Sequence, residues 1–238
     1  MKYAVISSSA PKKCIEWLRS LGYTVLPLPP FDRLSEPVNT HADMLFFSYN
    51  DIIVTHRDYY RVARDVFDTL AEECGMILVL SDCDVNSKYP YDVAFNAIAL
   101  GGTLYSNTAH TSPDVLSLFT DRVPVRQGYA ACSTLALSDK CVITADVSLA
   151  QEYRRHGVDV TMIRGGSISL PPYDCGFIGG ASGVDRDTVF FVGSIDSHAD
   201  AEAIKNAVHS QKMNFISLSD EPLFDVGGIK FVHKLDRR

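Results

Sequence analysis

The feature that most constrains the fold is a unit that recurs five times along the chain. Each unit opens with a small polar residue and an apolar strand, continues through a second strand and a helix, and returns through another strand. The five opening segments are His41–Phe47, Tyr91–Asn96, Ala131–Leu137, Tyr173–Ile178 and Phe224–Ile229. They lie about 40 to 51 residues apart. Self-similarity at this period is typical of repeat and propeller architectures.

The last unit is incomplete, because it opens near Asp225 and no helix follows. Residues 1–30 supply what it lacks, namely a strand, a helix and a second strand at Tyr3–Ser7, Pro11–Leu21 and Tyr23–Leu28. We therefore expect one domain over residues 1–238, an α/β fold in which five ββαβ units form a five-bladed propeller. The N-terminus would complete its last unit. The alternative is a doubly wound α/β sheet, whose βαβ units recur at a similar period.

Small polar residues and prolines mark the other helix starts. Thr55 precedes the first of these helices, Thr111-Ser112-Pro113 opens the second, Thr144 or Asp146 caps the third, and Ser197 caps the fourth. The predicted helices are Asp58–Glu73, a short one from Asp114, Ser148–Arg155 and His198–His209. The predicted return strands are Met76–Leu80, Val158–Ile163 and Phe215–Leu218.

Composition and charge exclude several classes of protein. A hydrophobic fraction of 46% rules out a disordered chain. The net charge of −7 argues against nonspecific binding to nucleic acid or to an anionic membrane, which needs a basic face. Apolar runs such as Met76–Leu80 are far shorter than the ~20 residues that span a bilayer. The start, MKYAVISSSAPKKC, lacks the longer apolar run of a signal peptide, so we expect a cytoplasmic protein.

The six cysteines show no metal-binding pattern. No two are spaced as CxxC, and no histidine pair lies at a zinc-finger distance, so we expect neither a metal nor another cofactor. In the cytoplasm these thiols would stay reduced. Most are expected to be small buried hydrophobic residues, and only a cysteine beside a positioned base would be reactive. The sequence leaves the oligomeric state open.

In a five-fold ring the first strand of each unit lies nearest the axis, so the residues at the openings converge. These residues are His41, Asp43, Asp92, Cys132, Asp174 and Asp225, with Asn96 and Ser133 close by. Carboxylates crowded together repel one another unless a cation lies between them. The centre therefore favours a small cationic partner. It also contains one thiol and one imidazole, the groups that nucleophilic catalysis requires.

The arrangement resembles the pentein superfamily of guanidino-group modifying enzymes, which includes arginine deiminases, dimethylarginine dimethylaminohydrolases, agmatine deiminases and amidinotransferases. Three short matches carry the resemblance. His41-Ala-Asp43 is similar to their His-x-Asp strand start, Cys132-Ser133-Thr134 to their Cys-x-Thr segment, and Asp225-Val-Gly227-Gly228 loosely to their Glu-Gly-Gly segment. The cysteine unit also lies two units after the His-x-Asp unit in both.

The resemblance implies a five-bladed propeller with a catalytic cysteine, a histidine as general acid and base, and an acid that holds the guanidinium. In those enzymes the cysteine lies in the last unit, whereas the last unit of this chain has none. The match therefore requires the units to be rotated, as by circular permutation. A closer likeness is to small bacterial proteins of unassigned function that share the phrases Gly128–Ser133 and Gly176–Gly183, and it implies no activity.

Two functions follow as hypotheses. The first is a Cys-dependent hydrolase or amidinotransferase acting on an arginine-like, guanidine-type C–N substrate. Cys132 would be the nucleophile, and His41, oriented by Asp43 or a neighbour, would transfer protons. Substrate binding is assigned to Asp92, Asn96, Ser133, Asp174 and Asp225. The second is a non-catalytic binding or regulatory protein that holds a cationic metabolite or a metal ion in the acidic centre.

Overall fold

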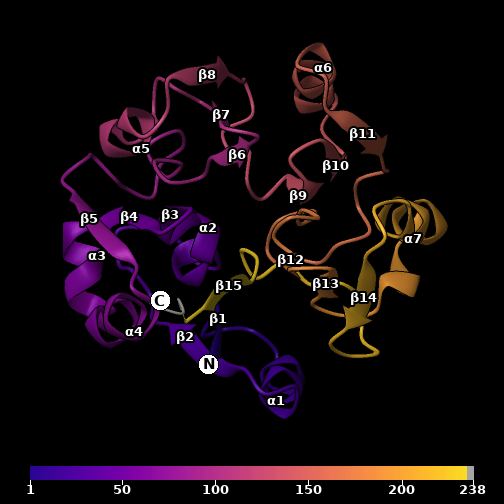
Figure 1. Ribbon diagram of the computed structural model, residues 1–238, viewed down its shortest axis with the longest axis horizontal. Coiled ribbons are helices and arrows are strands. Elements are labelled where there is room, and N and C mark those ends of the chain that lie inside the picture. Colours follow the sequence, from indigo (N-terminus) through magenta and orange to yellow (C-terminus); the bar gives the residue numbers. More distant parts are fainter. Residues whose placement is uncertain (235–238) are drawn as a thin grey trace.

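Five small three-stranded sheets are arranged in a ring in the computed structural model, which describes residues 1–234 (Figure 1). In each sheet the middle strand pairs antiparallel with the inner strand and parallel with the outer one. The five-bladed prediction is confirmed. From the inner strand outward, the sheets are β3 (Phe46–Tyr49), β4 (Ile52–His56), β5 (Ile77–Ser81); β6 (Ile98–Leu100), β7 (Thr103–Ser106), β8 (Asp121–Pro124); β9 (Thr134–Ser138), β10 (Cys141–Thr144), β11 (Asp159–Met162); β12 (Ser182–Asp185), β13 (Thr188–Phe191), β14 (Asn214–Ser217); and β15 (Lys230–His233), β1 (Lys2–Ser7), β2 (Thr24–Leu28).

The last sheet joins the two ends of the chain. Strand β1 pairs antiparallel with β15, from Lys2 opposite His233 to Val5 opposite Lys230, and parallel with β2. The N-terminal strand is thus the middle strand of the sheet that the C-terminal strand begins, as the sequence predicted. The alternative of one doubly wound sheet is wrong, because no sheet among residues 1–234 has more than three strands.

Most helices connect the middle strand of a sheet to its outer strand and lie on the outside of the ring (Figure 1). Ser112 and Asp146 cap their helices as predicted, accepting from the amides of Asp114 and Leu149. The outer helices are α1 (Lys12–Ser20), α3 (Arg57–Val62), α4 (Arg64–Cys74), α5 (Pro113–Ser117), α6 (Val147–Arg155) and α7 (Ala201–Ser210).

Three predictions of local structure are wrong. The helix expected over residues 58–73 is divided into α3 and α4 at Ala63, which leaves the helical region. Ser197 ends a 3₁₀ turn, Ile195–Ser197, and α7 begins only at Ala201. The opening segments are mostly not strands, because Ala42–Leu45 forms a helical turn, α2, before β3, and residues 91–96, 173–178 and 224–229 are turns that precede β6, β12 and β15. The return strand β8 had not been predicted.

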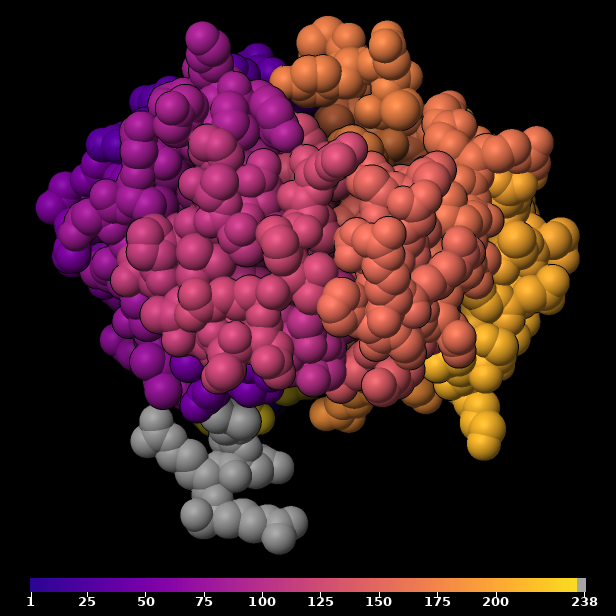
Figure 2. All heavy atoms as spheres, turned by 90° about the horizontal axis from the view of Figure 1, so that it is seen from above, coloured from indigo at the N-terminus to yellow at the C-terminus, as the bar shows by residue number. Residues whose placement is uncertain are grey.

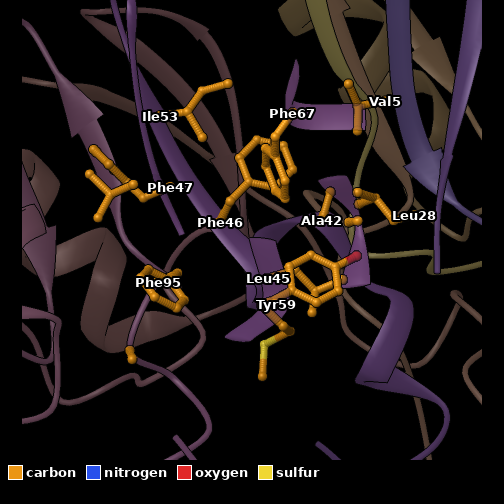
Figure 3. Close-up of a cluster of buried hydrophobic side chains, with 14 of the residues drawn as sticks. Val5, Leu28, Ala42, Leu45, Phe46, Phe47, Ile53, Tyr59, Phe67 and Phe95 are labelled. Atoms are coloured by element: carbon orange, nitrogen blue, oxygen red, sulfur yellow. The ribbon is translucent and has the colours of Figure 1, made fainter. Parts of the chain in front are cut away.

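The largest hydrophobic cluster holds the central segment His41–Leu45 in place. Ala42 and Leu45 lie in this cluster with Phe46 of β3, and the rings of Phe46 and Phe67 pack edge-to-face at 5.8 Å between centroids (Figure 3). Because Ala42, Met44 and Leu45 of α2 are anchored in the core, the residues between and beside them are fixed as well. Two of these are His41 and Asp43.

Seen from its edge, the ring shows the second and third units packed against each other without a break (Figure 2). No helix among the described residues is long and apolar enough to cross a membrane. All six cysteines are free, and Cys14, Cys74, Cys132 and Cys141 are buried.

Candidate active site

The centre of the ring is built by the turns that lead into the five inner strands. Four of these turns place side chains close together: Asp43 from α2, Asn96 before β6, Cys132 before β9 and Asp225 before β15. All four side chains are buried.

Cys132 is held by two polar neighbours. Its thiol donates a hydrogen bond to Oδ2 of Asp43 over 2.7 Å, and Nδ2 of Asn96 lies 3.0 Å from Sγ. The side-chain oxygen of Asn96, Oδ1, accepts from the backbone amides of Ala131 at 2.8 Å and Cys132 at 3.3 Å. Asn96 therefore fixes both the thiol and the turn that carries it.

Asp43 is a carboxyl group with an incomplete set of partners. Oδ2 accepts from the thiol, whereas Oδ1 is buried without a hydrogen-bond partner among residues 1–234. Burial, together with the charge of Asp225, raises the pKa of Asp43 to about 7. Asp43 also lines a second cavity, of about 410 Å³, which lies between the inner strands and contains Lys230.

The carboxylate of Asp225 is held by two backbone amides. Its Oδ2 accepts from the amide of Phe177 at 2.8 Å and its Oδ1 from the amide of Gly227 at 2.9 Å. Burial nevertheless raises the pKa of Asp225 to about 6, although both backbone hydrogen bonds act in the opposite direction. A Cβ on Gly180 would lie 2.0 Å from Oδ1, so only glycine fits beside this carboxylate.

His41 completes the group. Its Nδ1 lies 3.7 Å from Oδ1 of Asp225, too far for a good hydrogen bond, and the ring is buried. Burial lowers the pKa of His41 to about 4, so the imidazole is neutral near pH 7. Burial and the charges of Asp43 and Asp225 raise the pKa of the Cys132 thiol well above its usual value. The Cys132 thiol therefore keeps its proton, and a cation placed beside it would offset the charges of Asp43 and Asp225.

His41, Cys132 and Asp225 face one cavity of about 150 Å³. Its other walls are mostly aromatic and aliphatic. They are formed by Val38, Met44, Tyr129, Leu170, Tyr173, Cys175 and Phe177. The arrangement combines a nucleophile, a proton acceptor and a carboxylate around a space of small-molecule size. Among residues 1–234 there is no group of three or more His, Cys, Asp or Glu side chains that could hold a metal ion.

Comparison with known proteins gives a family. A family model described as "Family of unknown function (DUF6873)" matches residues 5–230. The chain belongs to this family. No curated protein sequence matches it.

Solved structures share the fold of this DUF6873 protein. DDAH from Pseudomonas aeruginosa, complexed with citrulline, aligns with a TM-score of 0.55 at 11% identity over 92% of each chain. The amidinotransferase SxtG from Microseira wollei gives 0.54 at 12% over 95% of this chain and 79% of its own. An agmatine deiminase from C. jejuni gives 0.54 at 9% over 91% and 87%. The DUF6873 chain thus has the five-unit pentein propeller fold.

Several predicted site residues of the DUF6873 protein do not reach the cavity. Asp174 is exposed in the loop before β12, so its predicted convergence with the other acids is wrong. Asp92 is buried behind Tyr129, whose hydroxyl donates to its Oδ2 over 2.7 Å. Ser133 faces a separate cavity of about 120 Å³, and its buried hydroxyl has no partner in the described part of the chain.

The error at Asp174 comes from the register of the units. The acid or thiol of each opening lies at a different distance before its inner strand, so these five residues are not equivalent. They are Asp43, Asp92, Cys132, Asp174 and Asp225. Counting back two residues from each inner strand gives the true equivalents. These are Met44, Asn96, Cys132, Gly180 and Gly228. The fourth unit therefore contributes glycine, not a carboxylate, to the centre.

The aromatic wall was missed altogether. The rings of Tyr129 and Phe177 stack at 6.2 Å between centroids with 30° between their planes, and Tyr89 packs against the other side of Tyr129 at 5.7 Å. The one available signal was that Tyr129 and Phe177 each stand five residues before an inner strand. That position becomes visible only once the strands are correctly placed.

Proposed function

We propose that this DUF6873 protein is a cysteine-dependent enzyme that cleaves a C–N bond of a guanidine-type substrate, as a hydrolase or an amidinotransferase. The observation that carries the proposal is that Cys132, His41 and Asp225 face one cavity while Asp43 accepts a hydrogen bond of 2.7 Å from the Cys132 thiol. The fold shared with a citrulline complex of DDAH, an amidinotransferase and an agmatine deiminase supports it.

Recognition would use Asp225. Its two oxygens are fixed by the amides of Phe177 and Gly227, and each keeps a lone pair for a further donor. A planar guanidinium presents paired N–H groups that match a carboxylate. The bound cation would also offset the charges that now oppose ionisation of the thiol, so the substrate itself would activate Cys132.

In the first step the Cys132 thiolate attacks the central carbon of the guanidinium. The thiol proton passes to Asp43, its hydrogen-bond partner. We assign its onward transfer to the departing nitrogen to the His41 ring, which is neutral and faces the same cavity as Cys132. The Sγ–C bond forms, the C–N bond breaks, and its electron pair leaves with the nitrogen as ammonia or an amine. The carbon remains on Sγ as a thiouronium cation.

In the second step His41 accepts a proton from water, and the hydroxide attacks the thiouronium carbon. The C–S bond breaks and its electron pair returns to Sγ. The product is a urea, and the protons left on His41 and on the product restore the thiol and protonate the released amine. If an amine replaces water at this step, the same intermediate gives amidino transfer.

The test compares Cys132→Ser with Cys175→Ser, because both cysteines face the cavity. Each variant and the wild type would be incubated with arginine, agmatine, methylated arginines and methylguanidine, and ureido products measured by mass spectrometry. Cys132→Ser should lower turnover by at least ~10³-fold, whereas Cys175→Ser should retain it. Full activity of Cys132→Ser would exclude the covalent mechanism.

A labelling experiment tests the site without knowing the substrate. Chloroacetamidine is a cation and chloroacetamide is its neutral counterpart of nearly the same shape. The amidine should modify Cys132 at least ~10-fold faster, because Asp225 attracts its positive charge. Equal rates would contradict recognition of a cation.

One observation favours a second candidate function. The Cys132 thiol keeps its proton, because its pKa is raised well above the usual value. It donates a hydrogen bond to Asp43, as a thiol with a purely structural role would. A non-catalytic protein that holds a small cation would need nothing more. A ligand that raises the melting temperature while Cys132 stays unmodified and no product forms would support this function over catalysis.

A further inference from the structure

The cavity that contains Cys132 limits what its ligand can be. Its volume is about 150 Å³. Cavities of about 150 Å³ in proteins accommodate a molecule the size of benzene, with about six non-hydrogen atoms. A guanidinium group with one small alkyl substituent fits this size, whereas arginine has about twice as many atoms.

The charges around the cavity are of one kind. Asp225 is the one carboxylate among the lining residues, and Asp43 adds a second carboxyl group against the Cys132 thiol. No lysine or arginine is among the residues that line the space. An amino acid substrate brings a carboxylate, and moving an unpaired carboxylate from water to such surroundings is unfavourable. The site is therefore complementary to the guanidinium group of arginine and is unfavourable for its carboxylate.

The remaining walls suit an alkyl group and the face of a cation. The hydroxyl of Tyr129 is already used by Asp92, so this residue offers the cavity its ring. Cations bind favourably over such rings. Met44 and Leu170 supply aliphatic surface that would cover an N-alkyl substituent.

The outer wall of the cavity, formed by Leu170, Tyr173 and Cys175, is held in place by backbone hydrogen bonds. The segment between β11 and β12 crosses beside the cavity and is tied to the segment before β15, because the amide of Ser169 donates to Leu223 and the amide of Asp225 donates to Ser169, both at 2.9 Å. Its tip carries Tyr173, which is 50% exposed and lines the cavity. A longer ligand would have to leave past Tyr173.

We propose that the ligand of this site is a compact monocation without a carboxylate, such as an N-alkylguanidine or a small amidine, and not an amino acid. The proposal rests on the proposed function in that it assumes recognition of a guanidinium by Asp225. It narrows the substrate class by the size of the cavity and by the absence of a basic residue from its lining.

The experiment is calorimetric titration of Cys132→Ser, in which turnover cannot interfere, with methylguanidine and with arginine. Methylguanidine should bind at least ~10-fold more tightly, because arginine must place its carboxylate without a partner. Equal or tighter binding of arginine would overturn the inference and leave the proposed function intact. If neither cation binds, the proposed function itself fails.

A pair of arginine substitutions tests the reason for this preference. Tyr173→Arg, made in the same Cys132→Ser background, places a cation at the cavity wall and should improve arginine binding at least ~3-fold relative to methylguanidine. Tyr91→Arg is the matched control, since Tyr91 is also an exposed tyrosine but does not line the cavity. An unchanged ratio in Tyr173→Arg, or the same gain in Tyr91→Arg, would show that the missing basic residue is not the cause.

Discussion

The turn before β9 and the turn before β12 share a backbone hydrogen bond and differ in the side chains that they carry. In the first, the amide of Ser133 donates to the carbonyl of Tyr129 at 2.9 Å, and in the second, the amide of Ala181 donates to Phe177 at 3.0 Å. The equivalence places Cys132 opposite Gly180, and the amide of Gly180 donates to the carbonyl of Cys132 at 3.0 Å. Two copies of one turn therefore meet at the centre of the ring.

The difference between the two turns lies in side chains alone. One turn carries a thiol, which Asp43 and Asn96 hold in place. The other carries no side chain at Gly180, and the space is filled by the carboxylate of Asp225. The two copies of one turn thus differ in that one carries a thiol and the other leaves room for a carboxylate beside it.

The largest expected effect comes from adding a side chain to the empty turn. In Gly180→Ala the new Cβ would lie 2.0 Å from Oδ1 of Asp225, so the carboxylate or the turn must move. We expect a loss of about 3 kcal/mol in the free energy of unfolding, measured in urea. Gly165→Ala is the control, because a Cβ there meets nothing within 4 Å. Equal losses in the two variants would contradict a special role for Gly180.

The carboxyl group that holds the thiol should make stability depend on pH. The pKa of Asp43 is about 7 in the folded protein, above its usual 3.8, so its stabilising contribution is present at low pH and is lost as the pH rises through about 7. Asp43→Asn removes this dependence. Between pH 5 and pH 8 the free energy of unfolding of Asp43→Asn, measured in urea, should rise by on the order of 2 kcal/mol relative to that of the wild type. Parallel curves for the two proteins would show that Asp43 is not perturbed.

The five-fold ring could be predicted from the sequence, because it depends on the order and period of apolar segments. The position of the acids could not. Asp43 stands three residues before its inner strand and Asp225 five, and the turns in which they lie have no hydrophobic period to fix their register. Asp174 looked equivalent only because an acidic residue recurs at about the right interval.

The sequence predicted that three residues from unit openings would lie close together, namely His41, Cys132 and Asp225, and all three face one cavity. The cavity walls were not predicted, because Leu170, Tyr173 and Phe177 come from the long connection between β11 and β12. The path of this connection is not repeated in the other units, and it depends on the segments that lie beside it. Its path is set by backbone pairing with the segment before β15, which the sequence does not display.

The aromatic residues that are equivalent in the two turns, Tyr129 and Phe177, differ by one hydroxyl group. In Tyr129→Phe the carboxylate of Asp92 loses its one side-chain donor, and its Oδ1 already has no partner among residues 1–234. We expect a loss of about 1.5 kcal/mol at pH 8, and a smaller loss at pH 5, because burial raises the pKa of Asp92 and a protonated carboxyl group needs this donor less. Tyr89→Phe, which keeps the ring that packs on Tyr129, should change stability little. A larger loss at pH 5 would contradict the role of the hydroxyl.

The smallest effect on stability should accompany the largest effect on function. Cys132→Ala shortens the side chain toward the glycine found at the equivalent position of the next unit, and it opens onto a cavity that already exists. We expect a loss of about 1 kcal/mol in urea unfolding, mainly from the missing hydrogen bond to Asp43, together with complete loss of turnover and of modification by chloroacetamidine. Cys175→Ala removes a thiol from the same cavity and should keep both activities. If Cys132→Ala instead failed to fold while Cys175→Ala was normal, the thiol would be a structural element of the turn, and the two turns would differ in packing as well as in chemistry.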